Sequence, residues 1–295
     1  MPDICLKTAT TVDQTADHGY LDYARSLFVC SKDHTDTTSA VHNLLQPLSR
    51  DAKVNIVGHG MVGLINTGTG ENGCSSDLKR CISINNPEKW RDVISGLKSH
   101  VSSLTLWSCD TGAEQDGVNL LFSLCQCINA PVAAPTGVVC SEPGRIWLGE
   151  LGAKWQIVYP DKPKPPKIEL PSKPARTINL LIVPHPKAPK HIPLEGIESI
   201  NIFPSSNLAR SFRVNKDDAI QLLRSVDLER PEVSSCSFAT IITGKIELKS
   251  RGQTLRTFLV HNHRILQDVE QKQNYYFSFD SSFRQLLTTV ESKYS

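Results

Sequence analysis

The sequence has no apolar run as long as the roughly 18 residues that a membrane-spanning helix needs. Residues 1–19 lack the basic start and apolar core of a secretory signal peptide, and they are rich in Thr and Asp. The net charge is only +2, which gives no electrostatic basis for binding nucleic acid or an anionic membrane surface. We therefore expect a flexible leader over residues 1–19, no membrane span and no nucleic-acid partner.

Several motifs that are typical of cofactor-binding sites are also missing. The sequence contains no phosphate-binding P-loop, no dinucleotide-binding glycine fingerprint and no internal repeat. Cys125 and Cys127 form a Cys-x-Cys pair, but no second pair follows at the spacing of a zinc site. We therefore expect neither a cofactor nor a bound metal.

Cysteine, by contrast, is abundant. Eight of the nine cysteines lie in the first 140 residues, and only Cys236 lies beyond them. An odd number, with several cysteines on apolar faces, is not typical of a disulfide framework. We therefore expect thiols and a cytoplasmic, reducing working compartment. Secretion into a host cell as a bacterial effector stays open as an alternative.

Hydrophobic periodicity predicts strands that alternate with helices over the first half of the chain. The predicted strands cover residues 23–30, 53–58, 103–107, 131–134 and 145–158. The predicted helices cover residues 37–48, a segment that starts at Asn86-Pro87, and a segment after Gly112. Residues 60–86 are expected to form a long loop with a short hairpin of 62–66 against 80–84. This alternation indicates an α/β domain over residues 20–158, with a mainly parallel sheet flanked by helices.

The pattern changes after residue 158. Residues 159–175 hold six prolines and four lysines, which is typical of a stiff, extended linker. Residues 176–295 are richer in strand patterns, and the predicted strands there are 178–183, 199–203, 238–248, 255–260 and 275–279, with helices at 217–226 and 281–292. We expect a second, α+β accessory domain over residues 176–295.

One stretch in the first domain places a reactive side chain at a strand end. The apolar run Ser103–Trp107 leads into Ser108 and Cys109, and a helical pattern follows Gly112. Ligands bind at the carboxyl ends of strands in open α/β sheets. A nearby helix amino terminus favours the thiolate, which is the nucleophilic form of cysteine.

A second stretch has the same design. The predicted strand 53–58 runs into His59 and Gly60. Imidazole is the side chain whose ordinary pKa suits proton transfer at neutral pH. The separation of 50 positions between His59 and Cys109 leaves room for the crossover that two neighbouring parallel strands need.

These residues resemble the caspase-like (clan CD) cysteine peptidases. His-Gly after one strand and Ser-Cys-x-x-Gly after the next are similar to the motifs of that group, and Cys109-Asp110-Thr111-Gly112 is closest to its bacterial CHAT-type members. Ala134-Pro135-Thr136 is similar to bacterial relatives of the same fold. The caspase pentapeptide Gln-Ala-Cys-x-Gly is absent, so the resemblance implies no preference for aspartate.

The resemblance implies a mechanism. Cys109 attacks a peptide carbonyl and forms an acyl-enzyme, while His59 transfers a proton to the leaving amine. The backbone amides of Gly60 and Cys109 bind the oxyanion. No third catalytic residue is implied. The partners are a protein or peptide substrate and an activating protein or ligand.

The resemblance also implies that the substrate pocket is built from the loop after the first strand and from segments beyond the cysteine strand. The charged residues that we expect to line it are Lys32, Asp33, Asp110 and Glu142. The acidic members would suit a basic substrate residue.

Two other functions remain open. The chain can be a catalytically inactive caspase-fold adaptor that acts through its carboxy-terminal domain, or an acyl-transfer enzyme such as a transpeptidase that uses the same pair of residues. Labelling of the Cys109 thiol separates the adaptor from the enzymes, and mass analysis of products separates the two enzymes.

Overall fold

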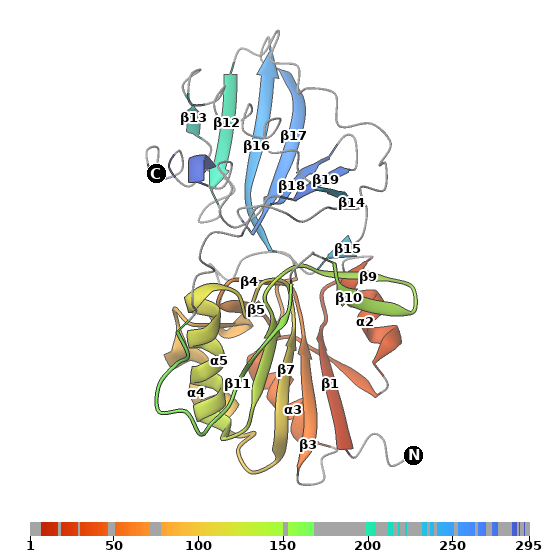
Figure 1. Ribbon diagram of the computed structural model, residues 1–295. Coiled ribbons are helices and arrows are strands. Elements are labelled where there is room, and N and C mark those ends of the chain that lie inside the picture. The colour runs from red at the N-terminus through yellow and green to blue at the C-terminus, as the bar shows by residue number, and fades with distance from the viewer. Residues whose placement is uncertain are drawn as a thin grey trace, which may run out of the picture. The chain divides into compact units, whose positions relative to one another are not determined.

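The structure is a computed structural model in which two compact units are distinguished (Figure 1). It describes residues 7–167, apart from gaps at 17–18, 29, 47–50, 71–77 and 150–152, and shorter segments between 199 and 292. Unit 1 comprises Met1–Ile168 and Cys236–Ile241, and unit 2 comprises Glu169–Ser235 and Ile242–Ser295. The division at Ile168 lies within the predicted linker, whereas the return of Cys236–Ile241 to unit 1 was not predicted.

Unit 1 is built on a six-stranded sheet in the order β11-β8-β7-β3-β1-β2. Its strands are β1 (Thr8–Asp13), β2 (Ser31–His34), β3 (Ala52–Val57), β7 (Val101–Trp107), β8 (Val132–Pro135) and β11 (Trp155–Val158). All neighbouring pairs are parallel except β11 with β8, which is antiparallel. The mainly parallel α/β sheet is confirmed.

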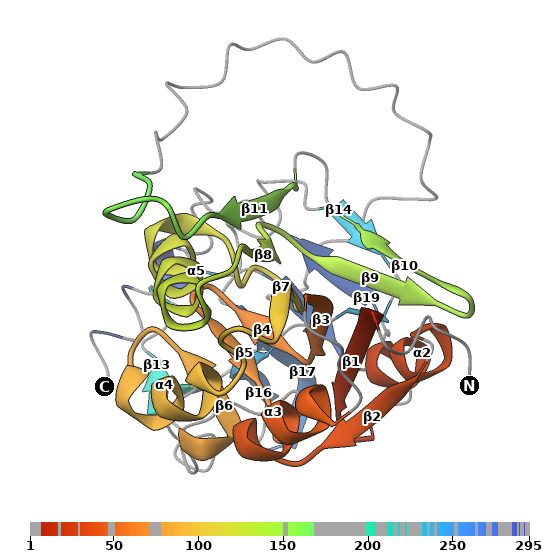
Figure 2. The same ribbon diagram turned by 90° about the horizontal axis from the view of Figure 1, so that it is seen from below.

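Four helices among the described residues flank this sheet. They are α2 (Tyr20–Leu27), α3 (Thr37–Leu45), α4 (Pro87–Ser95) and α5 (Glu114–Ile128). The last three cover one face, while α2 lies against the other (Figure 2). The core beneath α3, α4 and α5 is apolar and contains Leu44, Ile56, Trp90, Leu106 and Leu121. Burial of such side chains at about 25 cal/mol per Å² is the main force that holds the helices on the sheet.

Two small antiparallel sheets complete unit 1. The first contains β4 (Gly60–Met61), β5 (Leu64–Asn66) and β6 (Cys81–Ser83), and a 3-10 turn at Leu78–Arg80 precedes β6. Its β5–β6 pairing confirms the predicted hairpin. The second contains β9 (Val139–Glu142), β10 (Arg145–Leu148) and β15 (Ser237–Phe238), in the order β10-β9-β15.

Two predictions about the amino-terminal region are wrong. The first concerns the leader 1–19, because Thr8–Asp13 forms β1 inside the main sheet. Its threonines are β-branched, which favours strands, and their hydroxyls are satisfied in the interior. Thr11 Oγ1 lies 2.8 Å from Nδ1 of His34, and Thr10 Oγ1 accepts a hydrogen bond from Asn55 Nδ2 at 3.0 Å.

The second concerns the predicted strand at residues 23–30, most of which belongs to helix α2. Tyr20, Leu21 and Ala24 are buried along one side of that helix. Asp22 and Arg25 form an i,i+3 ion pair at 2.6 Å, and Ala, Leu and Arg are strong helix formers. These local helical preferences outweigh the short apolar run at 27–30 that suggested a strand.

The described part of unit 2 holds a seven-stranded antiparallel sheet in the order β13-β12-β16-β17-β18-β19-β14. The strands are β12 (Ser199–Pro204), β13 (Phe212–Val214), β14 (Glu232–Ser234), β16 (Ile242–Ser250), β17 (Gln253–His261), β18 (Ile265–Asp268) and β19 (Gln273–Tyr276). The predicted strand 178–183 and most of the predicted helices 217–226 and 281–292 lie outside the described residues. The α+β accessory domain stays a prediction.

Candidate functional site

His59 and Cys109 occupy equivalent positions after two neighbouring parallel strands. The last pair in the β3–β7 register joins Val57 to Trp107. His59 and Cys109 each lie two residues beyond that pair, and both are fully buried. The prediction that the two residues follow adjacent strands of the sheet is confirmed.

The segment around His59 is held closely by backbone contacts. The carbonyl oxygen of His59 accepts a hydrogen bond from the backbone N–H of Asn66 at 2.8 Å. The imidazole meets the ring of Tyr20 in an edge arrangement, with 5.9 Å between ring centroids. The Tyr20 hydroxyl in turn donates to the carbonyl oxygen of Trp107 at 2.8 Å, so α2 ties the two strand ends together.

Gly60 brings the loop of His59 against the loop of Cys109. A Cβ atom at position 60 would lie 2.5 Å from Thr111 Oγ1 and 2.7 Å from Ser108 Cβ. These distances are well inside van der Waals contact, so no side chain fits there. The same two residues share a short hydrogen bond, with 2.6 Å between Ser108 Oγ and Thr111 Oγ1. Thr111 Oγ1 also lies 2.8 Å from the carbonyl oxygen of Leu64 in β5.

The thiol of Cys109 lies against the backbone of β9. The N–H of Val139 donates to Sγ of Cys109 at 3.1 Å, and Sγ lies 3.6 Å from the Val139 carbonyl oxygen. One residue further along the loop, the N–H of Asp110 donates to the carbonyl oxygen of Gly137 at 3.0 Å. In this conformation β9 therefore covers the sulfur.

The predicted pocket residues do not gather in one place. Asp110 is buried beside Cys109 and has a positive φ of 58°. Glu142 ends β9 and pairs with Arg145 across the hairpin at 2.5 Å. Lys32 and Asp33 lie on the edge strand β2, which is about 14 Å from β7 at the usual strand spacing.

Two residues at the ends of β1 and β2 were not predicted from the sequence. Asp13 ends β1 and His34 ends β2, and the parallel register pairs them directly. Both are fully buried. Together with His59 and Cys109, they place polar or reactive side chains at the carboxyl ends of four consecutive strands. Their position at strand ends was the available signal, but it required β1 to be recognised.

Asp13 is a saturated hydrogen-bond acceptor. Oδ1 accepts from the backbone N–H and hydroxyl of Thr15 at 2.9 and 2.8 Å. Oδ2 accepts from the backbone N–H groups of Gly68 and Gly70 at 2.9 and 3.0 Å. Its carboxylate therefore anchors the loop after β5, the strand that includes Asn66.

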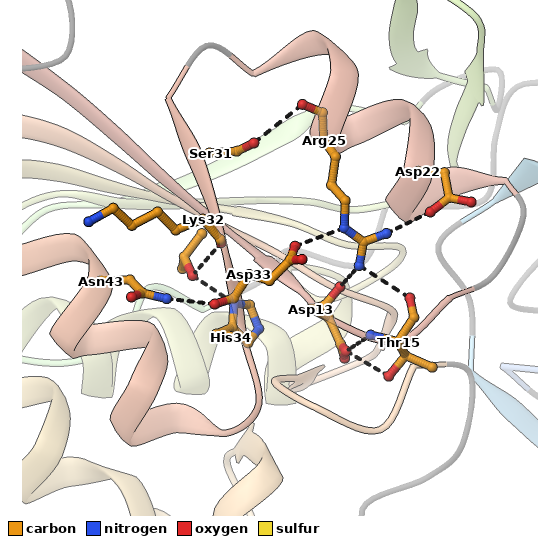
Figure 3. Close-up of polar contacts among 10 residues, drawn as sticks. Asp13, Thr15, Asp22, Arg25, Ser31, Lys32, Asp33, His34 and Asn43 are labelled. Atoms are coloured by element: carbon orange, nitrogen blue, oxygen red, sulfur yellow. Dashed lines mark hydrogen bonds and ion pairs between the residues drawn. The ribbon is translucent and has the colours of Figure 1, made fainter.

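Arg25 of helix α2 lies beside Asp13 and Thr15 (Figure 3). Its guanidinium donates to the carboxylates of Asp22 at 2.6 Å and Asp33 at 2.8 Å, and to the carbonyl oxygen of Asp13 at 2.5 Å. The contact of Asp33 with Arg25 shows what this predicted pocket residue does in the folded chain: it fixes α2 to β2.

Burial lowers the pKa of His34 to about 4, and the negative charges of Asp13, Asp33 and Asp36 oppose that shift only in part. Its Nδ1 lies 2.8 Å from Thr11 Oγ1, and its Nε2 has no hydrogen-bond partner among the described residues. His34 is therefore neutral at pH 7, because the buried ring cannot replace the hydration of a charge.

The expectation that all cysteines are thiols is wrong for three of them. Cys30, Cys81 and Cys140 are disulfide-bonded, whereas Cys109, Cys125 and Cys127 remain thiols. An odd count excludes complete pairing, but it does not exclude a mixture of thiols and disulfides. Burial, with a contribution from the charge of Asp161, raises the pKa of Cys125 to about 11. Burial likewise raises the pKa of Cys127.

Within the described ranges, no group of three or more His, Cys, Asp or Glu side chains is placed to hold a metal ion. No helix in this part of the chain has both the length and the apolar character to cross a membrane. Comparisons with protein-family models, with curated proteins and with solved structures find no match to this chain.

Proposed function

We propose that unit 1 is a cysteine endopeptidase of the caspase-like type, with Cys109 as nucleophile and His59 as its proton-transfer partner. One observation carries the proposal: the two side chains lie at matched positions, two residues beyond the last pair of the parallel β3–β7 ladder. A mainly parallel sheet flanked by helices is also what the caspase-like resemblance implies.

The proposed reaction runs through an acyl-enzyme. The Cys109 thiolate forms a bond to the carbonyl carbon of a peptide, and the backbone N–H groups of Gly60 and Cys109 bind the oxyanion. His59 donates a proton to the amine as the C–N bond breaks. Water then hydrolyses the thioester, which releases the carboxylic acid and restores the thiol.

The closed contact between Cys109 and β9 means that the proposed peptidase must rearrange before a substrate can reach the sulfur. A regulated protease that responds to a partner or ligand fits this arrangement. The same contact is the specific observation that favours the second proposal, an inactive caspase-fold adaptor, because a fully buried cysteine is often only a small core residue.

Cleavage assays on the full chain separate the two proposals. Protein substrates are incubated with the wild type and with Cys109→Ala, with and without a thiol reductant, and products are identified by mass spectrometry. The matched control is Cys125→Ala, which removes another buried thiol on helix α5. The peptidase proposal predicts cleavage that Cys109→Ala abolishes and Cys125→Ala retains. Equal cleavage by all three folded proteins, or none under any condition, would favour the adaptor.

A further inference from the structure

Strand β9 has two neighbours that hold it at the Cys109 thiol. It pairs antiparallel with β10 on one edge and with β15 on the other. The β9–β10 hairpin turns at Gly144, whose φ of 85° is the left-handed conformation that glycine adopts readily. On the other edge, Ser237 of β15 pairs with Ser141, 96 residues earlier in the chain.

Strand β15 comes from the carboxy-terminal part of the chain. The chain enters unit 2 after Ile168, returns to unit 1 only for Cys236–Ile241, and then resumes unit 2 at Ile242. β15 is the strand within that returning segment. The carboxy-terminal part of the chain therefore contributes an edge strand whose pairing partner is the strand that covers Cys109.

A disulfide lies next to the point of contact. Val139 touches the Cys109 sulfur, and the next residue, Cys140, is disulfide-bonded. Gly149 packs closely on the same cysteine, since a Cβ atom at position 149 would lie 2.1 Å from its Sγ. The N–H of Gly149 also donates to the Val138 carbonyl oxygen at 2.8 Å. β9 is thus paired on both edges and cross-linked at its second residue.

We propose that β9 is a redox-controlled lid over Cys109, held closed by the disulfide of Cys140 and by pairing with β15. A dithiol opens the lid by thiol–disulfide exchange. Two electrons pass to the protein, the S–S bond breaks, Cys140 and its partner sulfur each become thiols, and the reductant leaves as its own disulfide. With the cross-link gone, β9 moves, the Val139 N–H leaves the Cys109 sulfur, and solvent reaches the thiol.

The two states correspond to two environments. Disulfides persist in oxidising compartments and are reduced in the cytoplasm. The lid would therefore stay closed where the protein is oxidised and open after transfer into a reducing compartment. This inference rests on the proposed function for its purpose, because a covered nucleophile needs a trigger, but its test does not depend on cleavage.

The test follows the Cys109 thiol itself. The full-length wild type receives a short iodoacetamide pulse at near-neutral pH after graded exposure to dithiothreitol, and peptide mass mapping reports the labelling of Cys109 and the reduction of Cys140 separately. We expect Cys109 to be labelled about tenfold or more faster once Cys140 is reduced, because labelling then follows opening of the lid. Equal labelling in the oxidised protein, or none after reduction of Cys140 in a protein that circular dichroism shows to be folded, would overturn the lid.

A variant pair assigns the effect to the correct disulfide. Cys140→Ser should expose Cys109 to iodoacetamide without any reductant. Cys81→Ser is the matched control, because it removes a disulfide from β6, which belongs to the other small sheet of unit 1, and it should leave Cys109 protected. Protection of Cys109 in folded Cys140→Ser would contradict the proposal. Exposure of Cys109 without any peptide cleavage would instead retain the lid and reject the peptidase.

Discussion

Two pairs of side chains at the carboxyl edge of the same sheet differ in what surrounds them. The outer pair, Asp13 and His34, ends β1 and β2, and the inner pair, His59 and Cys109, follows β3 and β7. All four are fully buried. Burial alone therefore does not separate a structural pair from a candidate catalytic pair.

The hydrogen bonds do separate them. The carboxylate of Asp13 accepts four hydrogen bonds from Thr15, Gly68 and Gly70, which leaves it no capacity for a substrate. The Cys109 sulfur, by contrast, contacts the peptide group of Val139, in a strand that belongs to a small three-stranded sheet. The outer pair holds loops together, whereas in our proposal the inner pair becomes accessible to a substrate when β9 moves.

The largest effect should come from the inner pair. His59→Ala should lower the rate of peptide cleavage by roughly 10²–10⁴-fold, the usual effect of removing a general acid–base. The free energy of unfolding should change much less than the activation free energy of cleavage. The double variant with Cys109→Ala should be little worse than Cys109→Ala alone, because the two residues act as one unit. Kinetics of cleavage under reducing conditions measure this, with exposed His100→Ala as control. Independent, additive losses would show that the two residues do not form a dyad.

The next largest effect should come from Asp13 and appear in stability. Asp13→Asn should lower the free energy of unfolding by about 4 kcal/mol, since it turns one acceptor into a donor that faces buried N–H groups. Asp33→Asn is the control, because its exposed ion pair with Arg25 should contribute about 1 kcal/mol or less. Urea unfolding of both variants measures the difference. Equal losses would mean that Asp13 is no more structural than a surface carboxylate.

His34 should make the protein sensitive to acid. Its pKa is about 4 in the folded state and about 6.5 in the unfolded chain, so only the unfolded chain gains this proton between those pH values. The unfolding free energy should therefore fall as the pH drops from 6.5 to 4, by about 3 kcal/mol from this residue.

The matched variants for this prediction are His34→Asn and His42→Asn, the latter on the exposed side of α3. Urea unfolding at pH 7, 5.5 and 4.5 should show a shallower pH dependence for His34→Asn, whereas His42→Asn should follow the wild type. An unchanged slope in His34→Asn would assign the acid sensitivity to other groups.

The smallest effect concerns the contact between the two inner loops. Gly60→Ala should lower the free energy of unfolding by about 2 kcal/mol, because the added Cβ would lie 2.5 Å from Thr111 Oγ1. At Gly144 no atom lies within 4 Å of the added Cβ. Gly144→Ala should therefore lower the free energy of unfolding only through the strain of a positive φ, by about 1 kcal/mol. Thermal unfolding of both variants compares them. A larger loss for Gly144→Ala would show that the loops are looser than described.

The inner pair was predictable from the sequence for a local reason. Each side chain follows a hydrophobic strand within two residues, and Gly60 and Gly112 mark the turns. The β5–β6 hairpin and helix α4, which begins at Pro87 after Asn86, were also predictable from nearby residues. In these elements the signal lies within a few residues, and pattern and structure agree.

At residues 23–30 the local helical preferences of α2 were missed. The other parts that failed depend on distant residues or on polar strands. Thr8–Asp13 lacks the apolar alternation of a strand, and its threonine hydroxyls become favourable only when β2 and β3 supply partners. The pairing of β15 with β9 joins residues 96 positions apart, and no local pattern at Ser237 indicates a partner. The contact of β9 with the Cys109 sulfur was not predictable because it is a tertiary contact.

The central claim is that its strand-end position makes Cys109 the reactive thiol of the chain. The most direct measurement compares Cys109 with Cys125 in the reduced, folded protein during one iodoacetamide pulse at near-neutral pH. Because burial raises the pKa of Cys125 to about 11, its thiolate is scarce, and we predict that Cys109 is labelled about a hundredfold faster. Labelling of Cys125 or Cys127 at the same rate as Cys109 would contradict the account.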